Sequence, residues 1–276
     1  MAEEPKLRWP GGHQVPRAYP IARHIREIFQ RALSALNEAR VPYVVGGAFA
    51  LHWYSGFWRV VKDLDVYLLP DHTGWAMRVL EGIGFNARVK HEQWLAEALM
   101  NHQKVDLIYG MGNWLSYVDE DYLDRSKQGI ILGIPTRIVP PEELIYSKAF
   151  VASRERYDAA DIFHLFVATA SELDWRHLLD LFGENWELLL GNLVLFRYIY
   201  PSHRELIPSW VLDELLARFQ QTRIQPWTGG KLCRGFLLDG IGTYSLDVKE
   251  WGYRDARQEA WEEREMRRAG GRRKAA

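Results

Sequence analysis

The sequence predicts an α+β fold followed by an all-helical C-terminal unit. Up to about residue 140, short apolar or alternating segments are interleaved with segments of helical periodicity. From Pro141 onward, successive segments all have the period of an amphipathic helix. The 276 residues are enough for one large domain or two modest ones, each with a hydrophobic core.

The first part of the chain begins with an irregular arm over residues 1–19, which is rich in proline and glycine. The next stretch, IARHIREIFQRALSALNEAR, places its apolar residues on one helical stripe, and Pro42 ends the helix. We expect a short buried strand in YVVGG, a short helix in AFALHWYSG that stops near Gly56, and a strand in DLDVYLLP that starts at Asp63.

The rest of this unit alternates helix and strand signals to residue 140. The stretch TGWAMRVLEGIG predicts a helix closed by Gly82 or Gly84. We expect strands in FNARVK and HQKVDLIYG, with a short helix around Trp94–Met100 between them, and a further strand in GIPTRIVP. Residues 20–140 are therefore expected to form one α+β domain.

The remainder of the chain is predicted to be helical over residues 141–225. Prolines followed by glutamates open this region, which is typical of a helix N-terminus. Residues 226–276 are expected to form a glycine-rich connection and a charged, partly disordered tail, basic from Arg264 onward.

Composition excludes several classes of function. A net charge of −1 gives no overall attraction to nucleic acid or to a membrane. The single cysteine, Cys233, cannot form an intramolecular disulfide and fits a reducing compartment. There is no secretory signal, no bilayer-length apolar run and no zinc-ligand spacing, so we expect a cytoplasmic protein without a membrane partner.

The chemistry is concentrated in the stretch VPYVVGGAFALHWYSGFWRVVKDLDVYLL. Gly46 and Gly47 stand at a strand–helix junction, where glycines let the backbone approach a ligand and free N–H groups favour phosphate. Asp63 and Asp65 share one face of a strand because side chains alternate with a period of two. Two such carboxylates need a cation between them, and Mg²⁺ carrying triphosphate oxygens meets that need.

A third carboxylate, Asp106, lies on a later predicted strand. Together the three could hold two metal ions, which form a clamp for in-line displacement at phosphorus. Arg59 and Lys62 are close in sequence and could neutralise phosphate charge.

The order Gly46-Gly47, spacer, Asp63-x-Asp65 and later Asp106 resembles the nucleotidyltransferase superfamily, which has the polymerase-β-like fold. The resemblance covers about residues 40–170. It is strongest to small prokaryotic members, which include antibiotic nucleotidyltransferases and the toxins of abortive-infection and toxin–antitoxin systems. A mixed β-sheet flanked by helices is the fold that it implies.

The resemblance also implies roles for these residues. Gly46 and Gly47 would bind nucleotide phosphates, and Asp63 and Asp65 would ligate two Mg²⁺ ions, for which Mn²⁺ could substitute. Asp106 would ligate metal and assist the general base.

A second segment, PEELIYSKAFVASRERYDAADIFHL, resembles the region that follows the catalytic domain in these proteins. By this resemblance Lys148 would reach the triphosphate. Asp158 and Asp161 would orient that lysine or contact the nucleotide. Arg154 or Arg156 would be the basic residue that stands between Lys148 and these aspartates in the sequence.

The expected activity is transfer of a nucleoside monophosphate from an NTP, such as ATP, to a hydroxyl-bearing acceptor. The acceptor could be a small molecule, a tRNA or a protein, and an antitoxin partner or a homo-oligomer is not readable from the chain. Two alternatives are a non-catalytic nucleotide-sensing module and, ranked lower, a glycosyltransferase that uses Asp-x-Asp to hold a metal.

Overall fold

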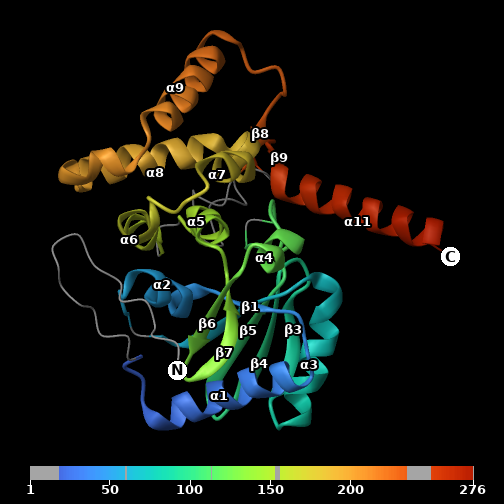
Figure 1. The fold of residues 1–276 in the computed structure, drawn as a ribbon. Helices are drawn as coiled ribbons and strands as arrows, with labels where there is room; N and C mark the ends of the chain where they lie inside the picture. Colours follow the sequence, from blue (N-terminus) through green and yellow to red (C-terminus); the bar gives the residue numbers. More distant parts are fainter. Residues whose placement is uncertain (1–18, 60, 113, 153–155, 235–249, 276) are drawn as a thin grey trace.

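A mixed sheet of seven strands occupies the centre of the first part of the chain (Figure 1). The computed structural model describes residues 19–59, 61–112, 114–152, 156–234 and 250–275. The predicted fold class is confirmed, since helices flank this sheet and further helices follow it. The expected arm at 1–19 lies outside the described residues except for Tyr19.

The sheet has the strand order β3-β4-β5-β2-β1-β7-β6. Strand β2 pairs in parallel with β5, and β1 in parallel with β7, while the other neighbours are antiparallel. The strands are β1 (Val44–Val45), β2 (Asp63–Tyr67), β3 (Asn86–His91), β4 (Leu95–Met100), β5 (Gln103–Ile108), β6 (Lys127–Ile131) and β7 (Ile134–Ile138).

Strand β1 is only two residues long, yet it joins the two halves of the sheet, because it pairs with β2 on one side and β7 on the other. Helix α2 (Gly47–Ser55) starts almost at once after it and ends at Gly56, whose φ is +70°. Left-handed backbone of this kind is a common helix terminator. The predicted strand, glycine pair and short helix are confirmed.

Helices α1 (Arg23–Glu38) and α3 (Thr73–Gly82) pack against each other and against the sheet (Figure 1). The buried residues of α1 are those of its predicted apolar stripe. Burial of this stripe, rather than helix propensity alone, holds the helix in place.

The helix that we expected around Trp94–Met100 is wrong. Trp94 lies in a turn, and Leu95–Met100 form β4, which pairs with β3 on one side and β5 on the other. Its first four residues are buried, so both faces are apolar or covered and the period-two alternation of a half-exposed strand is missing. Strand β6 and the short helix α4 (Glu120–Asp124) were not expected either.

The helices after residue 140 lie beyond the sheet in Figure 1. Helices α5 and α6 pack against α2, and α7, α8 and α9 follow them. These helices are α5 (Pro141–Ala149), α6 (Ala159–Thr169), α7 (Trp175–Phe182), α8 (Trp186–Ile199) and α9 (Ser209–Ile224). Within the described ranges, 3₁₀ turns are found at Pro70–His72, Gly183–Asn185 and Pro201–Leu206.

The C-terminal segment contains two short strands and a helix. Strands β8 (Leu232–Cys233) and β9 (Arg254–Asp255) pair in parallel, and helix α11 (Ala256–Ala275) includes the basic stretch from Arg264 onward. None of the helices among the described residues is both long enough and apolar enough to cross a membrane.

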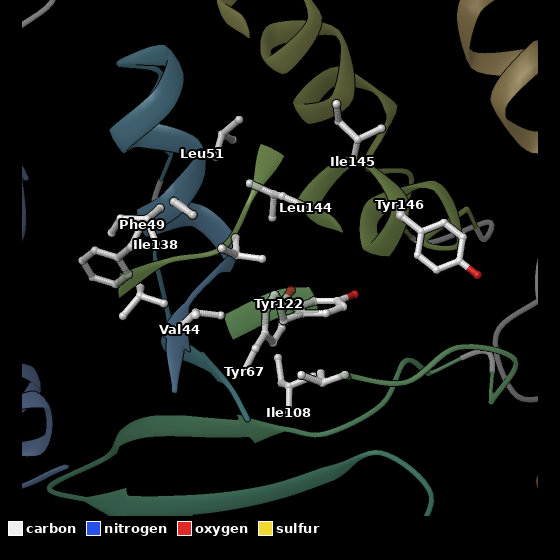
Figure 2. Close-up of a cluster of buried hydrophobic side chains, with 14 of the residues drawn as sticks. Val44, Phe49, Leu51, Tyr67, Ile108, Tyr122, Ile138, Leu144, Ile145 and Tyr146 are labelled. Atoms are coloured by element: carbon white, nitrogen blue, oxygen red, sulfur yellow. The ribbon is translucent and has the colours of Figure 1, made fainter. Parts of the chain in front are cut away.

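The hydrophobic core runs from the sheet into the helices that follow it. Figure 2 shows a part of it in which side chains from β1, β2, β5 and β7 meet side chains of α2, α4 and α5. The hydroxyl of Tyr54 on α2 donates a hydrogen bond to the carbonyl of Val139 (2.7 Å), which ties α2 to the end of β7. The core thus fixes α2, and with it the glycine pair, relative to the strands.

Phe49 on α2 lies in a cluster of aromatic side chains. It is fully buried, and its ring lies 5.4 Å from Tyr19, 5.9 Å from Phe29 and 5.5 Å from Trp58, centroid to centroid. Phe49→Ala should lower the free energy of unfolding by about 3–5 kcal/mol, because it removes buried surface and leaves a cavity. Urea denaturation measures this. Phe219→Ala on α9, where the side chain is 48% exposed, is the control and should change stability by less than about 0.5 kcal/mol.

Candidate active site

The glycine pair brings the start of α2 against β2. The backbone N–H of Gly46 donates to the carbonyl of Asp65 (3.0 Å). Gly47 has a φ of +54°, and a Cβ at this position would lie 1.6 Å from Oδ2 of Asp65. A side chain at residue 47 would therefore collide with the carboxylate, so the close approach requires glycine.

The three candidate aspartates lie on two neighbouring parallel strands. Asp63 and Asp65 are on one face of β2, and the register places Asp63 beside Lys104 and Asp65 beside Asp106 on β5. Because residues i and i+2 of a strand share a face, all four side chains project to the same side of the sheet. The register brings together the carboxylates that sequence alone could only place on separate strands.

Lys104 lies between two of these carboxylates. Its Nζ is 2.7 Å from Oδ2 of Asp106 and 3.2 Å from Oδ2 of Asp63. The ammonium is therefore the direct cationic partner of this part of the cluster, and it holds together two groups that would otherwise repel.

The cluster carries strong like-charge repulsion. Burial, with the charges of Asp63 and Asp106, raises the pKa of Asp65 to about 7, against the lowering effect of Lys148 and Arg156. Burial also raises the pKa of Asp106, although the hydrogen bond from Lys104 opposes this. Excess negative charge in a partly dry site favours an additional cation.

The aspartate carboxylates are suitable ligands for a metal ion, although their present arrangement is not that of a complete metal site. No group of three or more His, Cys, Asp or Glu side chains is arranged to hold a metal ion in the part of the chain that the structure describes. However, Oδ1 of Asp106 is buried and has no hydrogen-bond partner among the described residues. An oxygen in this position, next to two further carboxylates, is the hard donor that Mg²⁺ prefers.

A second charged cluster joins α5, α6 and the segment after α2. Nζ of Lys148 is 2.6 Å from Asp161 and 3.3 Å from Asp158, and Nη2 of Arg59 is 3.0 Å from Asp161. Arg156 donates to both carboxylate oxygens of Asp158 at 2.9 Å. Burial alone would raise the pKa of Asp158, but the hydrogen bonds of Arg156 and the charge of Lys148 hold it below its ordinary value.

The two clusters interact electrostatically, since the positive charges of Lys148 and Arg156 lower the pKa of Asp65 in the first cluster. Three cations surround two aspartates in the second cluster, which leaves an excess of positive charge. The side chain of Lys148 is only 5% exposed, whereas that of Arg156 is 61% exposed. Lys62 is exposed just before β2 and makes no ion pair with the described residues, and Arg154 lies outside them.

Comparison with known proteins identifies the family. Residues 25–192, more than half of the chain, match the family model described as "Nucleotidyl transferase of unknown function (DUF2204)". The chain belongs to this family. It is therefore a nucleotidyltransferase, and the superfamily resemblance drawn from its glycine and aspartate pattern is confirmed. This assignment disfavours the glycosyltransferase alternative.

Similar solved structures include the antibiotic-resistance factor ANT(2'')-Ia (TM-score 0.45, 16% identity, 67% of this chain and 97% of that chain). Two others are a nucleotidyltransferase-like antigen from Paracoccidioides brasiliensis (0.44, 15%, 66% and 91%) and the lincosamide antibiotic adenylyltransferase LnuA (0.38, 15%, 50% and 94%). Similarities of this degree bear on neither substrate nor mechanism. A search of curated proteins finds no significant match.

Lys104 is the residue of this site that the sequence pattern did not single out. It lies two positions before Asp106, so strand alternation alone places both on one face. The signal was available once β5 had been recognised, but the pairing with Asp63 depends on a register that no local pattern gives.

Asp65→Asn should stabilise the metal-free protein in a pH-dependent way. Because the folded pKa of about 7 is above the ordinary value, the native state keeps a proton between about pH 4 and 7 that the unfolded chain has lost. Stability therefore falls as the pH rises through this window, and asparagine removes that loss. In EDTA at pH 8 the melting midpoint should rise by about 2–4 °C. At pH 4.5 the gain should nearly vanish, and an equal gain at both pH values would refute the explanation.

Lys148→Met should destabilise the protein by about 3 kcal/mol, because it leaves two buried aspartates with less positive charge. Arg156→Met is the matched control in the same cluster. Its side chain is largely exposed, so its loss should cost about 1 kcal/mol. Denaturant unfolding of both variants measures the difference. A smaller loss for Lys148 than for Arg156 would show that the buried ammonium is not what holds the cluster together.

Proposed function

We propose that the protein transfers a nucleoside monophosphate from an NTP to a hydroxyl group of an acceptor, in a reaction that depends on divalent cations. The observation that carries this proposal is the register of β2 and β5. It sets Asp63, Asp65 and Asp106 on one face, and Asp65 lies directly against Gly47 at the start of α2. Acidic groups beside a helix N-terminus combine donors for a cation with N–H groups for phosphate.

The nucleotide would bind between the two charged clusters. Gly46, Gly47 and the first turn of α2 offer backbone N–H groups for the phosphates. Arg59 and Arg156 are partly exposed and carry positive charge beside the buried aspartates. We propose that these two arginines, together with Lys62 before β2, neutralise the negative charge of the nucleotide phosphates. Lys148 is buried, so its proposed role is to hold Asp158 and Asp161 and to add positive potential at the triphosphate.

Asp63, Asp65 and Asp106 would hold Mg²⁺, for which Mn²⁺ can substitute, and we propose two ions. When bound, the ions supply positive charge to the triphosphate oxygens and to the departing pyrophosphate. The raised pKa of Asp65 is consistent with this role, because added positive charge allows a crowded carboxylate to ionise.

Asp106 would assist the general base. The acceptor oxygen forms a bond to the α-phosphorus, the bond between that phosphorus and the α–β bridging oxygen breaks, and pyrophosphate leaves with the electron pair. The acceptor proton goes to the carboxylate of Asp106, at the oxygen that is not bound to metal. A carboxylate whose pKa is raised by burial is a better base than an exposed one.

The acceptor class remains one of three: a small hydroxyl-bearing molecule, a tRNA or a protein side chain. A toxin-like role would follow if the acceptor were tRNA or protein, and a resistance role if it were an antibiotic. The helices from α5 onward pack beside the site through α2 and would form the wall against which the acceptor binds.

Labelled transfer tests the proposal. The purified protein is incubated with Mg²⁺ or Mn²⁺ and each α-labelled NTP, with total tRNA, aminoglycosides, a protein extract, or no acceptor. Asp106→Asn should reduce the transfer of label by at least about 10³-fold, because it removes both a metal ligand and the proton acceptor. Circular dichroism checks that the variant is folded.

Asp213→Asn on α9 is the matched control, since this aspartate is exposed and belongs to neither charged cluster. It should transfer label at the wild-type rate. If NTP binds but no label moves to any acceptor, the non-catalytic nucleotide-sensing alternative is favoured. Undiminished transfer by Asp106→Asn would contradict the assignment of the site.

A further inference from the structure

The cluster of aspartates already contains a cation of its own. Lys104 contacts Asp63 and Asp106 at the same time, and no other ammonium or guanidinium contacts either carboxylate among the described residues. Its position is set by the backbone, because β5 places Lys104 beside Asp63 and two residues before Asp106. Lys104 has no role in the function proposed above.

A neighbouring carboxylate, that of Glu97, has a cationic partner for each of its two oxygens. Glu97 on β4 lies opposite Asp106 in the register, and it is buried. Arg88 binds one of its carboxylate oxygens and Lys90 the other at 3.0 Å, so both oxygens are matched. At the aspartate cluster, by contrast, one ammonium serves two carboxylates, and Oδ1 of Asp106 is left unmatched.

Lys104 is also able to leave. Its side chain is 26% exposed and that of Asp63 is 33% exposed, so the ion pair reaches solvent on one side. A lysine is a point charge on a flexible stem with four carbons, which can swing away without moving the backbone. A divalent cation carries twice the charge and binds carboxylate oxygens directly, so it would replace the ammonium where both compete for one place.

We propose that Lys104 is a built-in counter-ion that holds Asp63 and Asp106 together in the ligand-free protein and yields its place to a divalent cation. Lys104 and the cation then exclude each other between these carboxylates. The displaced ammonium remains within reach of the site, where the negative charge of a bound triphosphate is its nearest new partner. Lys104 is thus a positioning residue that tunes metal affinity, and this role rests on the metal dependence proposed above.

Metal binding by the full chain, without nucleotide, tests this. Mn²⁺ titrations followed by calorimetry or by electron paramagnetic resonance give the dissociation constant. Lys104→Met should bind Mn²⁺ about tenfold more tightly than the wild type, because the competing charge is gone. Lys104→Arg keeps the charge and should remain within a few-fold of the wild type. Lys127→Met removes a lysine from β6, an edge strand that β1 and β7 separate from β2, and should not change the affinity.

Thermal unfolding gives a second readout that does not depend on activity. In EDTA, Lys104→Met should melt at a lower temperature than the wild type, because Asp63 and Asp106 lose their shared partner. Saturating Mn²⁺ should raise its melting temperature by more than it raises that of the wild type. A deficit in EDTA that Mn²⁺ does not selectively reverse would mean that the lysine is a structural ion-pair partner only, and would overturn the proposal.

The outcomes separate this proposal from the one on which it rests. If the wild type binds Mn²⁺ and Lys104→Met binds it equally or more weakly, the counter-ion role is wrong and metal dependence stands. If neither protein binds Mn²⁺ with or without an NTP, both the counter-ion role and the metal-dependent mechanism fall. Tighter binding by the methionine variant, and wild-type affinity in Lys127→Met, support the competition between lysine and metal.

Discussion

Repulsion between like charges is the constraint around which this structure is arranged. The parallel pairing of β2 and β5 forces Asp63, Asp65 and Asp106 onto one face of the sheet. Such a group is stable only if positive charge is supplied from nearby. Lys104 supplies it by direct contact, and Lys148 and Arg156 supply it through the field that they exert on Asp65.

The same requirement links the sheet to the helices that follow it. Lys148 comes from α5, Asp161 from α6, and Arg59 from the segment between α2 and β2, so their ion pairs join three parts of the chain. Each buried charge in this group would be unfavourable without the others. These ion pairs therefore hold the helical part against the site, in addition to the packing of α2 against α5 and α6.

Patterns of short range were enough to predict most of the elements that build the site. Alternation identified β2 from its first aspartate, and Gly56 marked the end of α2. The same reasoning took β4 for a helix, because a strand covered on both faces has no alternation. The contacts of Lys104 and the burial of Lys148 could not be predicted, since they depend on strand register and on packing between distant segments. The helix at 256–275 was missed because its charged composition resembles that of a solvated tail.

The brevity of β1 has a mechanical consequence. Two residues, Val44 and Val45, form the seam between a four-stranded and a two-stranded part of the sheet, and the chain passes from this seam straight into Gly46. The backbone that is proposed to meet the phosphates is therefore also the backbone that joins the two parts. A force that displaces this loop when a ligand binds is therefore transmitted to both parts of the sheet. Amide exchange at Val45 would be a natural gauge of that force.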